Sequence, residues 1–366
     1  MTGSPLSLIR TGDWLDAQSF PDLAWTVPGI VPEGFGLLTG PPKLGKSWLA
    51  LHLGLAVAQG AAAFGAIGTG VPRPVLYLAL EDGERRLQGR ARKLLDGAPI
   101  PANLHYATSL PAATVLAAIG EWLDAFGERE PLVILDTLGK VMPPSTPGES
   151  AYARDYRIGS ALKAMSDAHP GTTLLVVHHT RKAEGVDWMD STSGTQGLNG
   201  SADFTVSLAR SRNESESVLR VTGRDVRENE YAMVSDDGRW ELAGKSLSEA
   251  AHAAAGLKAS TGLGDDSTRV VAFVGEHSSG VTPGQVAAHM GWEDKKASAY
   301  LGRLVTAGRI ERPQRGVYTP VGTVGSVGSG IETNGPITPN TTCRDCGGEI
   351  DPVLLAEGFP HCEAAA

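Results

Sequence analysis

Residues 40–47 read Gly-Pro-Pro-Lys-Leu-Gly-Lys-Ser and match the phosphate-binding pattern G-x-x-x-x-G-K-[ST] at every fixed position. A short apolar run at residues 35–38 predicts a buried strand before the loop, and helical spacing of apolar residues over 48–59 predicts a helix after it. Glycines let backbone N–H groups converge on phosphate oxygens, and the helix N-terminus adds partial positive charge. The chain is therefore expected to bind a nucleoside triphosphate within an α/β domain.

The residues of this loop have separate predicted roles. Lys46 would reach the β- and γ-phosphates, and the hydroxyl of Ser47 would bind Mg²⁺ beside ATP. The predicted nucleotide-binding set consists of Gly40, Pro41, Pro42, Lys43, Leu44, Gly45, Lys46, Ser47 and Trp48. The alternative, an ordinary glycine turn, would not require the strand and the helix that flank this loop.

Length and composition limit the number of domains and the class of protein. A chain of 366 residues exceeds what one core organises, so about two or three domains are expected. Hydrophobic residues at 41% and charged residues at 20% are ordinary for a soluble globular protein. The sequence has neither an apolar run of membrane-spanning length nor the pattern of a signal peptide, so no membrane partner is expected.

Cysteine and charge restrict location and partners. The three cysteines all lie at the C-terminal end, which excludes a disulfide-built main body and favours a cytoplasmic location. The net charge of −9 argues against a globally basic coat for nucleic acid. It leaves open a nucleic-acid contact confined to one loop or pore.

Composition also suggests where the chain divides. The β-branched apolar runs 75–80, 132–135 and 173–177 alternate with helical stretches and predict a parallel sheet with helices on both faces. The runs 203–209, 217–222 and 231–234 resemble an antiparallel extension of that sheet. The expected divisions are a lead-in over 1–33, a P-loop domain over 34–243, a linker over 244–265, a compact unit over 266–320, a flexible linker over 321–342 and a tail over 343–366.

Polar residues follow the predicted parallel strands, where ligands bind such sheets. Asp136 follows four apolar residues in a Walker B pattern and would belong to the Mg²⁺ shell. Glu81 and Asp82 follow an earlier strand, and a helix N-cap is the plain alternative for Asp82. The tandem pair His178 and His179 follows a third strand, and one of the two would sense the γ-phosphate unless both are structural.

In combination these motifs resemble the RepA-type AAA family, the RecA/DnaB-fold hexameric helicases of plasmids and phages. The similarity spans roughly residues 14–242. It is carried by residues 25–34, 40–49, 76–82, 136–141, 178–182 and 194–203. The resemblance implies a RecA-like fold, ATP hydrolysis with Mg²⁺ and assembly into a homohexameric ring on single-stranded DNA.

The same resemblance implies roles for single residues. Glu81 would be the catalytic base, and His179 would couple the γ-phosphate to a DNA-binding loop. Arg224 would be the arginine finger that completes the site of a neighbouring subunit, although Thr222 stands where DnaB-like proteins usually have lysine. That departure keeps other arginines open as fingers, namely Arg210, Arg212 and Arg227.

Residues 181–200 are the predicted DNA-binding loop. Arg181 and Lys182 begin it, and small polar residues that include Thr195 and Gln196 would donate hydrogen bonds to a phosphate backbone. Glu184, Asp187 and Asp190 offset its cations, so a ring of six copies would have to compensate by multiplicity. An ordered linker without a ligand is the alternative.

Residues 266–320 have the pattern of a winged helix-turn-helix. Three predicted helices, over 268–277, 282–290 and 294–307, precede two short β segments around a basic turn. The cations that would face DNA phosphates are Lys295, Lys296, Arg303, Arg309, Arg312 and Arg315. Protein docking is the alternative, because the fold alone does not fix the ligand.

The tail contains half of a zinc knuckle. Cys343 and Cys346 have the spacing of paired ligands, and His361 with Cys362 would complete a Zn²⁺ site. Neighbouring residues seldom point at one metal ion, so a metal-free tail stays open as well.

These observations predict an ATPase that moves along single-stranded DNA and hydrolyses ATP at subunit interfaces. A RecA-like ATPase that loads or regulates replication or recombination proteins without unwinding DNA is the second hypothesis. A nucleotide-switched binding module is the third, and Glu81 weighs against it because a switch has less need of a base.

Overall fold

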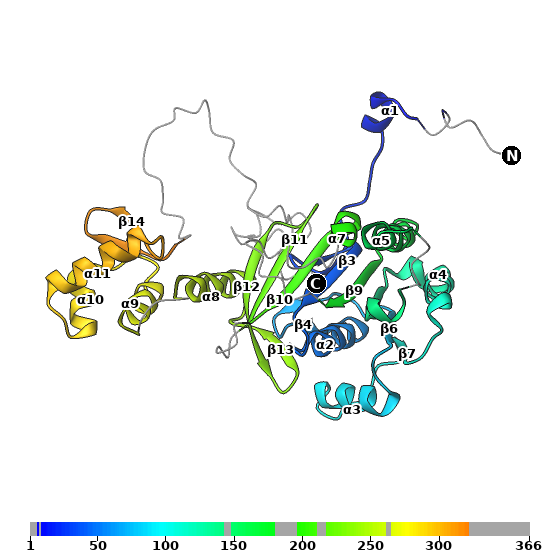
Figure 1. Ribbon diagram of the computed structural model, residues 1–366, viewed down its shortest axis with the longest axis horizontal. Coiled ribbons are helices and arrows are strands. Elements are labelled where there is room, and N and C mark those ends of the chain that lie inside the picture. The colour runs from blue at the N-terminus through cyan, green and yellow to red at the C-terminus, as the bar shows by residue number, and fades with distance from the viewer. Residues whose placement is uncertain are drawn as a thin grey trace, which may run out of the picture. The chain divides into compact units, whose positions relative to one another are not determined.

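The computed structural model describes residues 6, 9–142, 148–179, 196–210, 217–260 and 265–321. Its main feature is a nine-stranded sheet in the order β13-β12-β11-β10-β3-β9-β8-β6-β7 (Figure 1). The parallel part consists of β3 (Gly34–Gly40), β6 (Val75–Ala79), β7 (Leu104–Ala107), β8 (Leu132–Asp136), β9 (Thr173–His179) and β10 (Phe204–Ala209). The antiparallel part consists of β11 (Ser217–Gly223), β12 (Asn229–Asp236) and β13 (Arg239–Leu242).

Helices cover both faces of the sheet, as the apolar runs predicted. Along β8, Leu132 and Ile134 pack toward one face, while Val133 and Leu135 pack toward the other. All four are fully buried, which is the pattern of a strand covered on both sides. One face is covered by α2 (Lys46–Gln59) and α3 (Glu84–Leu94), and the other by α4 (Val115–Phe126), α5 (Ala151–Asp167) and α7 (Gln196–Ser201) (Figure 1).

One strand direction differs from the expectation. Residues 203–209 were expected to belong to an antiparallel extension, but β10 runs parallel to β3 with Val206 opposite Leu38. Strand β9 is also parallel to β3, and the chain from β9 to β10 includes α7 on one face. A connection of that kind returns the chain in the same direction. Only β11, β12 and β13 form the antiparallel extension.

The N-terminal segment is partly built into the domain. Helix α1 (Gly12–Asp16) has no buried residue. Strands β1 (Trp25–Val27) and β2 (Val31–Pro32) form a hairpin, and Val27 and Ile30 within it are completely buried in the core. The hydroxyl groups of Thr26 and Thr173 lie 2.8 Å apart and fix the hairpin to β9. The segment over 1–33 that was expected as a lead-in therefore contains part of the folded domain.

The segment expected as a linker over 244–265 contains α8 (Leu247–Ser260). Its Ala250 is completely buried and belongs to the core of the sheet domain. The remaining short elements of this domain are β4 (Ala62–Ala63), β5 (Ile67–Gly68), η2 (Ala112–Thr114), η3 (Gly127–Arg129) and η4 (Leu138–Lys140). No helix in the described ranges combines the length and the apolar character needed to cross a membrane.

Residues 265–321 form three helices and a hairpin. The elements are α9 (Asp265–Gly275), α10 (Pro283–Met290), α11 (Asp294–Thr306), β14 (Glu311–Gln314) and β15 (Val317–Thr319). Val270, Val286 and Leu301, one from each helix, are completely buried in a shared core. Thr282 begins α10 with a capping box to Gln285. The order and packing resemble a winged helix.

Two of the cations predicted on α11 lie over aromatic rings. The ammonium of Lys296 is 3.9 Å from the ring centroid of Trp292, and the guanidinium of Arg303 is 4.3 Å from that of Tyr300. Both cations remain exposed. Such stacking holds the charged groups in defined positions on the surface of the helix.

Candidate nucleotide site

Four neighbouring parallel strands bring the predicted site residues to one edge of the sheet. Strands β3, β9, β8 and β6 are consecutive in the sheet. Gly40 pairs with His179, and Asp136 pairs with both Val177 and Ala79. Because the carboxyl ends of parallel strands share one edge, the phosphate loop lies beside the ends of the strands that precede His179, Asp136 and Glu81.

The phosphate loop depends on its glycines. Gly40 and Gly45 have φ angles of +145° and +104°, values that other residues rarely adopt. A Cβ atom on Gly40 would lie 2.5 Å from the backbone oxygen of Leu208, and one on Gly45 would lie 3.0 Å from the ring of Trp240. A side chain at either position would therefore be strained. Its Pro41, Pro42 and Lys43 are exposed, which leaves the outer side of the loop open to a ligand.

Lys46 lies across the base of this loop and is only 3% exposed. Its ammonium donates hydrogen bonds to the carbonyl oxygens of Gly40 at 2.7 Å and Pro41 at 2.9 Å. Burial lowers the pKa of Lys46 to about 8, against the opposing effect of the Asp136 and Glu81 carboxylates. A bound triphosphate would supply the negative charge that this buried cation lacks.

Asp136 is 3% exposed and lies at the end of β8. Its Oδ2 accepts a hydrogen bond of 2.8 Å from the hydroxyl of Tyr77, whereas its Oδ1 is buried without a partner. Burial raises the pKa of Asp136, and hydrogen bonds from Ser47 and Tyr77 oppose that rise. Mg²⁺ prefers hard oxygen ligands, so the unpartnered Oδ1 of Asp136 and the hydroxyl of Ser47, which lies near the same carboxyl group, fit the predicted ion.

Glu81 and Asp82 have different environments although they are adjacent. Glu81 is exposed and accepts a 3.3 Å hydrogen bond from the Thr137 hydroxyl. Asp82 has a side chain that is 8% exposed and forms ion pairs with Arg86, at 3.2 Å, and with Arg90. Glu81 is therefore the acid that remains available to the site.

The N-cap interpretation of Asp82 is wrong. Helix α3 begins at Glu84 after Gly83, and its N-cap position has no side-chain hydrogen bond. Asp82 instead contacts side chains of the first two turns through Arg86 and Arg90. The sequence pattern did not indicate these partners, which lie within helix α3.

His179 is exposed at the end of β9. Its pKa is lowered, first by partial desolvation and then by the charge of Lys46, while Glu81 and Asp136 act in the opposite direction. The carboxylates of Glu81 and Asp136 therefore raise the pKa of both His179 and Lys46. The imidazole is neutral at neutral pH and able either to donate or to accept one hydrogen bond.

Trp48 and Trp240 pack around the loop in different ways. The ring of Trp48 lies under the guanidinium of Arg90, 5.1 Å from its ring centroid, and against Gly238. Its ring is therefore engaged with the protein, and the backbone N–H of the first helical turn is the part left for a nucleotide. Trp240, which the sequence analysis did not select, is 1% exposed, and its indole N–H is buried without a partner beside Gly45.

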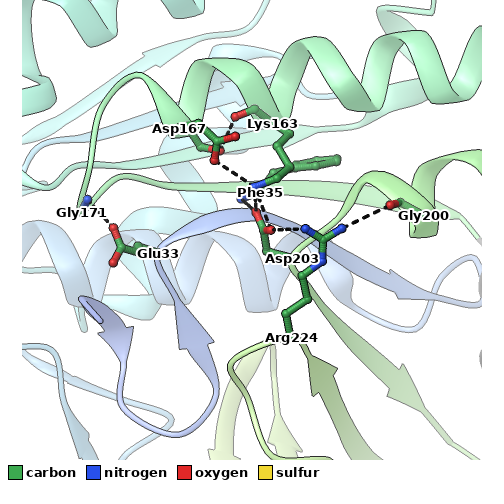
Figure 2. Close-up of polar contacts among 9 residues, drawn as sticks. Glu33, Phe35, Lys163, Asp167, Gly171, Gly200, Asp203 and Arg224 are labelled. Carbon is green, nitrogen blue, oxygen red and sulfur yellow. Dashed lines mark hydrogen bonds and ion pairs between the residues drawn. The ribbon is translucent and has the colours of Figure 1, made fainter. Parts of the chain in front are cut away.

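Arg224 lies at the opposite edge of the sheet from the phosphate loop. Gly223 pairs with Phe204 at the start of β10, and Phe204 pairs with Gly36 near the start of β3. Figure 2 shows the guanidinium of Arg224 between Asp203, at 3.5 Å, and the carbonyl oxygen of Gly200, also at 3.5 Å. Its side chain is 57% exposed. Arg224 is thus remote from the phosphate loop of the same chain.

Asp203 connects this edge to the strand of the phosphate loop (Figure 2). Its carboxylate accepts a 3.0 Å hydrogen bond from the backbone N–H of Phe35 and pairs with Lys163 at 2.9 Å. Its backbone carbonyl accepts a 2.8 Å hydrogen bond from the N–H of Arg224. One aspartate therefore fixes the starts of β3 and β10 and the residue that follows β11.

The competing finger arginines lie elsewhere. Arg210 is exposed directly after β10, at the edge that carries the phosphate loop. Arg227 is exposed between β11 and β12. Arg212 lies outside the described residues.

Two predicted sites also fall outside the described residues. Of the DNA loop, Arg181, Lys182 and Thr195 are not described, while Gln196 opens α7. The predicted zinc ligands Cys343, Cys346, His361 and Cys362 are not described either. Among the residues that are described, no group of three or more His, Cys, Asp or Glu side chains is arranged to hold a metal ion.

Residues 4–185 match the family described as "AAA domain". The matched range contains the phosphate loop and the residues that meet at the edge of the sheet, from Glu81 to His179. Together with the phosphate loop and the mostly parallel sheet, this match supports a P-loop domain of the AAA type. Residues 269–321 match the family described as "Transcriptional regulator, AbiEi antitoxin", which covers the winged-helix-like unit.

This chain also has similarity to three solved structures. The ATPase domain of G40P is 13% identical, with a TM-score of 0.46 over 57% of this chain and 84% of that chain. A DnaB-like replicative helicase is 12% identical, with a TM-score of 0.45 over 57% of each chain. The RadB recombinase is 16% identical, with a TM-score of 0.41 over 58% of this chain and 92% of that chain.

Proposed function

We propose that this chain is a Mg²⁺-dependent ATPase that moves along single-stranded DNA as a ring of six subunits, in the manner of RepA-type helicases. The observation that supports the ATPase is the set of Lys46, Ser47 and Asp136 at one edge of the sheet, with Glu81 and His179 beside them. Phosphoryl transfer to water requires a loop that binds the phosphates, oxygen ligands for Mg²⁺ and a catalytic base.

Each residue of the site has a task that its environment allows. Lys46 would exchange its two carbonyl partners for phosphate oxygens and neutralise their charge. Ser47 and Asp136 would hold Mg²⁺, which when bound neutralises charge on the phosphate oxygens. Glu81 would orient the attacking water and accept its proton, because Asp82 is already paired with two arginines.

His179 would respond to the γ-phosphate. It is the last residue of β9, the strand that pairs directly with β3, and its pKa is lowered by desolvation and by the charge of Lys46. A neutral imidazole is able to donate a hydrogen bond to a phosphate oxygen and to lose it after hydrolysis. The residues that follow His179 in the sequence belong to the predicted DNA-binding loop, so this hydrogen bond would couple hydrolysis to DNA.

The position of Arg224 supports the proposed assembly into a ring. An arginine at the opposite edge of the sheet is unable to reach the phosphate loop of its own subunit. A neighbouring copy in a closed ring would place it on the next nucleotide. The DNA contacts of this proposal are Arg181, Lys182, Thr195 and Gln196, and a zinc site at residues 343–362 stays a separate prediction.

ATPase and unwinding assays test the proposal. The motor predicts that single-stranded DNA stimulates hydrolysis and that the protein unwinds a forked duplex, with Lys46→Ala as the inactive control. Hydrolysis without unwinding would favour the ATPase that loads or regulates other proteins. Binding of ATP without any hydrolysis would overturn both and favour a nucleotide switch.

A further inference from the structure

Two tyrosines on α5 form a stacked pair on the surface. Tyr152 and Tyr156 are 51% and 48% exposed, which is unusual for large aromatic side chains. Their ring centroids are 6.1 Å apart and the ring planes differ by 14°. The spacing of four residues places both rings on one face of the helix. About half of the surface of each tyrosine is therefore open to a partner.

This pair lies beside the start of α7. A Cβ atom on Gly197 would lie 2.6 Å from the carbonyl oxygen of Tyr152 and 2.9 Å from the backbone nitrogen of Tyr156. The backbones of the two helices are therefore in direct contact at the turn that carries the tyrosines. Further along the same interface, Gly159 and Ser201 pack equally closely.

The connectivity places the pair at the edge of the sheet that carries the nucleotide site. Helix α5 follows β8 in the sequence, and α7 follows β9. Both strands end at the carboxyl edge, where Asp136 and His179 lie. The tyrosines occupy the first two turns of α5, so they lie near the end of the helix that the chain reaches from this edge.

The exposed neighbours of the pair are small or already paired. Ala153 and Ser160 are exposed, and their side chains are too small to cover an aromatic ring. Arg157 is engaged by both carboxylate oxygens of Glu149, at 3.0 and 3.2 Å. A protein partner would bury the rings within a continuous apolar patch, and these neighbours do not provide one. A flat group that stacks on the faces of the rings needs no apolar surface around them.

We propose that Tyr152 and Tyr156 form a stacking platform for the bases of single-stranded DNA. The proposal rests on the proposed function and adds a contact of a different kind, because stacking recognises bases and the predicted cations recognise phosphates. Every base has a flat π-face, so the platform is independent of sequence, as a translocating protein requires. Duplex DNA keeps its bases stacked on each other and is not a ligand of this surface.

The test compares two probes on the full-length protein in the presence of a non-hydrolysable ATP analogue and Mg²⁺. Fluorescence anisotropy is measured with labelled oligothymidylate and with an abasic oligonucleotide of equal length. Tyr152→Ala/Tyr156→Ala is expected to weaken oligothymidylate binding about fivefold or more for each base that stacks. Abasic binding and the salt dependence of affinity should not change, because no phosphate contact is removed.

Two control variants accompany this test. Tyr152→Phe/Tyr156→Phe keeps the rings and should bind like the wild type. Tyr106→Ala removes a tyrosine that is 50% exposed on β7, away from this helix face, and should also bind normally. Equal affinity of the alanine pair and the wild type for oligothymidylate would overturn the platform. So would an equal loss on the abasic probe, or a change of subunit number by light scattering that accounts for the loss.

The proposed function and the platform fail in different ways. If the wild type binds neither probe, the single-stranded DNA partner is wrong and the platform falls with it. If the wild type binds oligothymidylate and the alanine pair binds it equally well, only the platform is wrong.

Discussion

The Tyr77 hydroxyl donates a 2.8 Å hydrogen bond to Oδ2 of Asp136 and thereby holds the carboxylate with its other oxygen free. Tyr77 is 1% exposed, and its pKa is raised by burial and by the charge of Asp136, so it remains a donor at all ordinary pH values. The tyrosine orients the oxygen that is predicted to bind Mg²⁺. Partners of this kind tune a metal site without contacting the metal.

Tyr77→Phe should therefore weaken the affinity of the site for Mg²⁺. The expected increase in the Mg²⁺ concentration needed for half-maximal ATPase rate is about tenfold, because the hydrogen bond that orients Asp136 is lost. Titration of ATPase activity with Mg²⁺ measures it. Tyr106→Phe is the control, and an unchanged titration for Tyr77→Phe would remove Tyr77 from the metal site.

The two adjacent acids should respond differently to loss of charge. Glu81→Gln should retain ATP binding and reduce turnover by about 10²- to 10⁴-fold, because a base acts only on the attacking water. Asp82→Asn should retain turnover and instead lower stability, since it breaks the ion pairs with Arg86 and Arg90. Nucleotide binding, steady-state kinetics and thermal unfolding are measured for both variants. Wild-type turnover in Glu81→Gln would transfer the role to another acid.

Several parts of this structure could be predicted because they depend on local pattern. The phosphate loop has fixed residue types, and buried strands such as β8 appear as short runs of apolar residues. Because parallel strands end at one edge, the positions of Glu81, Asp136 and His179 after their strands were enough to predict that they meet. None of these inferences needs the order of the strands in the sheet.

Other parts could not be predicted because they depend on packing between distant segments. The direction of β10 is set by the crossover through α7, which short strand-like runs do not record. Strand β7 has only one buried residue, Leu104, and so lacks an apolar run. Trp240 lies beside Gly45 although it belongs to β13, the last strand of the antiparallel part of the sheet. The exposed stack of Tyr152 and Tyr156 likewise gives no periodic signal.

Trp240 should report on the nucleotide. Its indole lies against Gly45 with an unpaired N–H, so movement of the loop on binding ATP would change its surroundings. We expect nucleotide to change the tryptophan emission of the wild type and to have little effect on emission in Trp240→Phe. Trp122→Phe, which alters a tryptophan stacked on Phe126 in α4, is the control and should keep the response. Persistence of the full response in Trp240→Phe would show that this part of the loop does not move.

Affinity for nucleotide should fall with rising pH above about 8. The pKa of Lys46 in the free protein is about 8, lowered from 10.5, so the side chain loses its proton as pH passes that value. Bound phosphates favour the charged form, so binding above pH 8 takes up a proton and weakens by at most about tenfold per pH unit. Below pH 8 this group causes no pH dependence. Calorimetry of ADP binding in buffers of different ionisation enthalpy measures the uptake, and zero uptake at about pH 9 would contradict this pKa.

Arg224→Ala should abolish hydrolysis in assembled protein while leaving the fold intact. Removal of a finger lowers kcat by about 10³-fold or more, whereas an ion pair as exposed as Arg224 with Asp203 contributes at most about 1 kcal/mol to stability. Arg227→Ala removes a second exposed arginine nearby and serves as the matched control.

The decisive measurement mixes two inactive proteins. Arg224→Ala subunits keep an intact phosphate loop, and Lys46→Ala subunits keep an intact Arg224. Because the two residues lie at opposite edges of the sheet, only an interface between the two kinds of subunit is able to join an intact loop with an intact finger. ATPase activity should therefore appear on mixing and reach a maximum near equal proportions. Absence of any recovery, or loss of turnover in Arg227→Ala instead, would exclude Arg224 as the residue that acts in the neighbouring site.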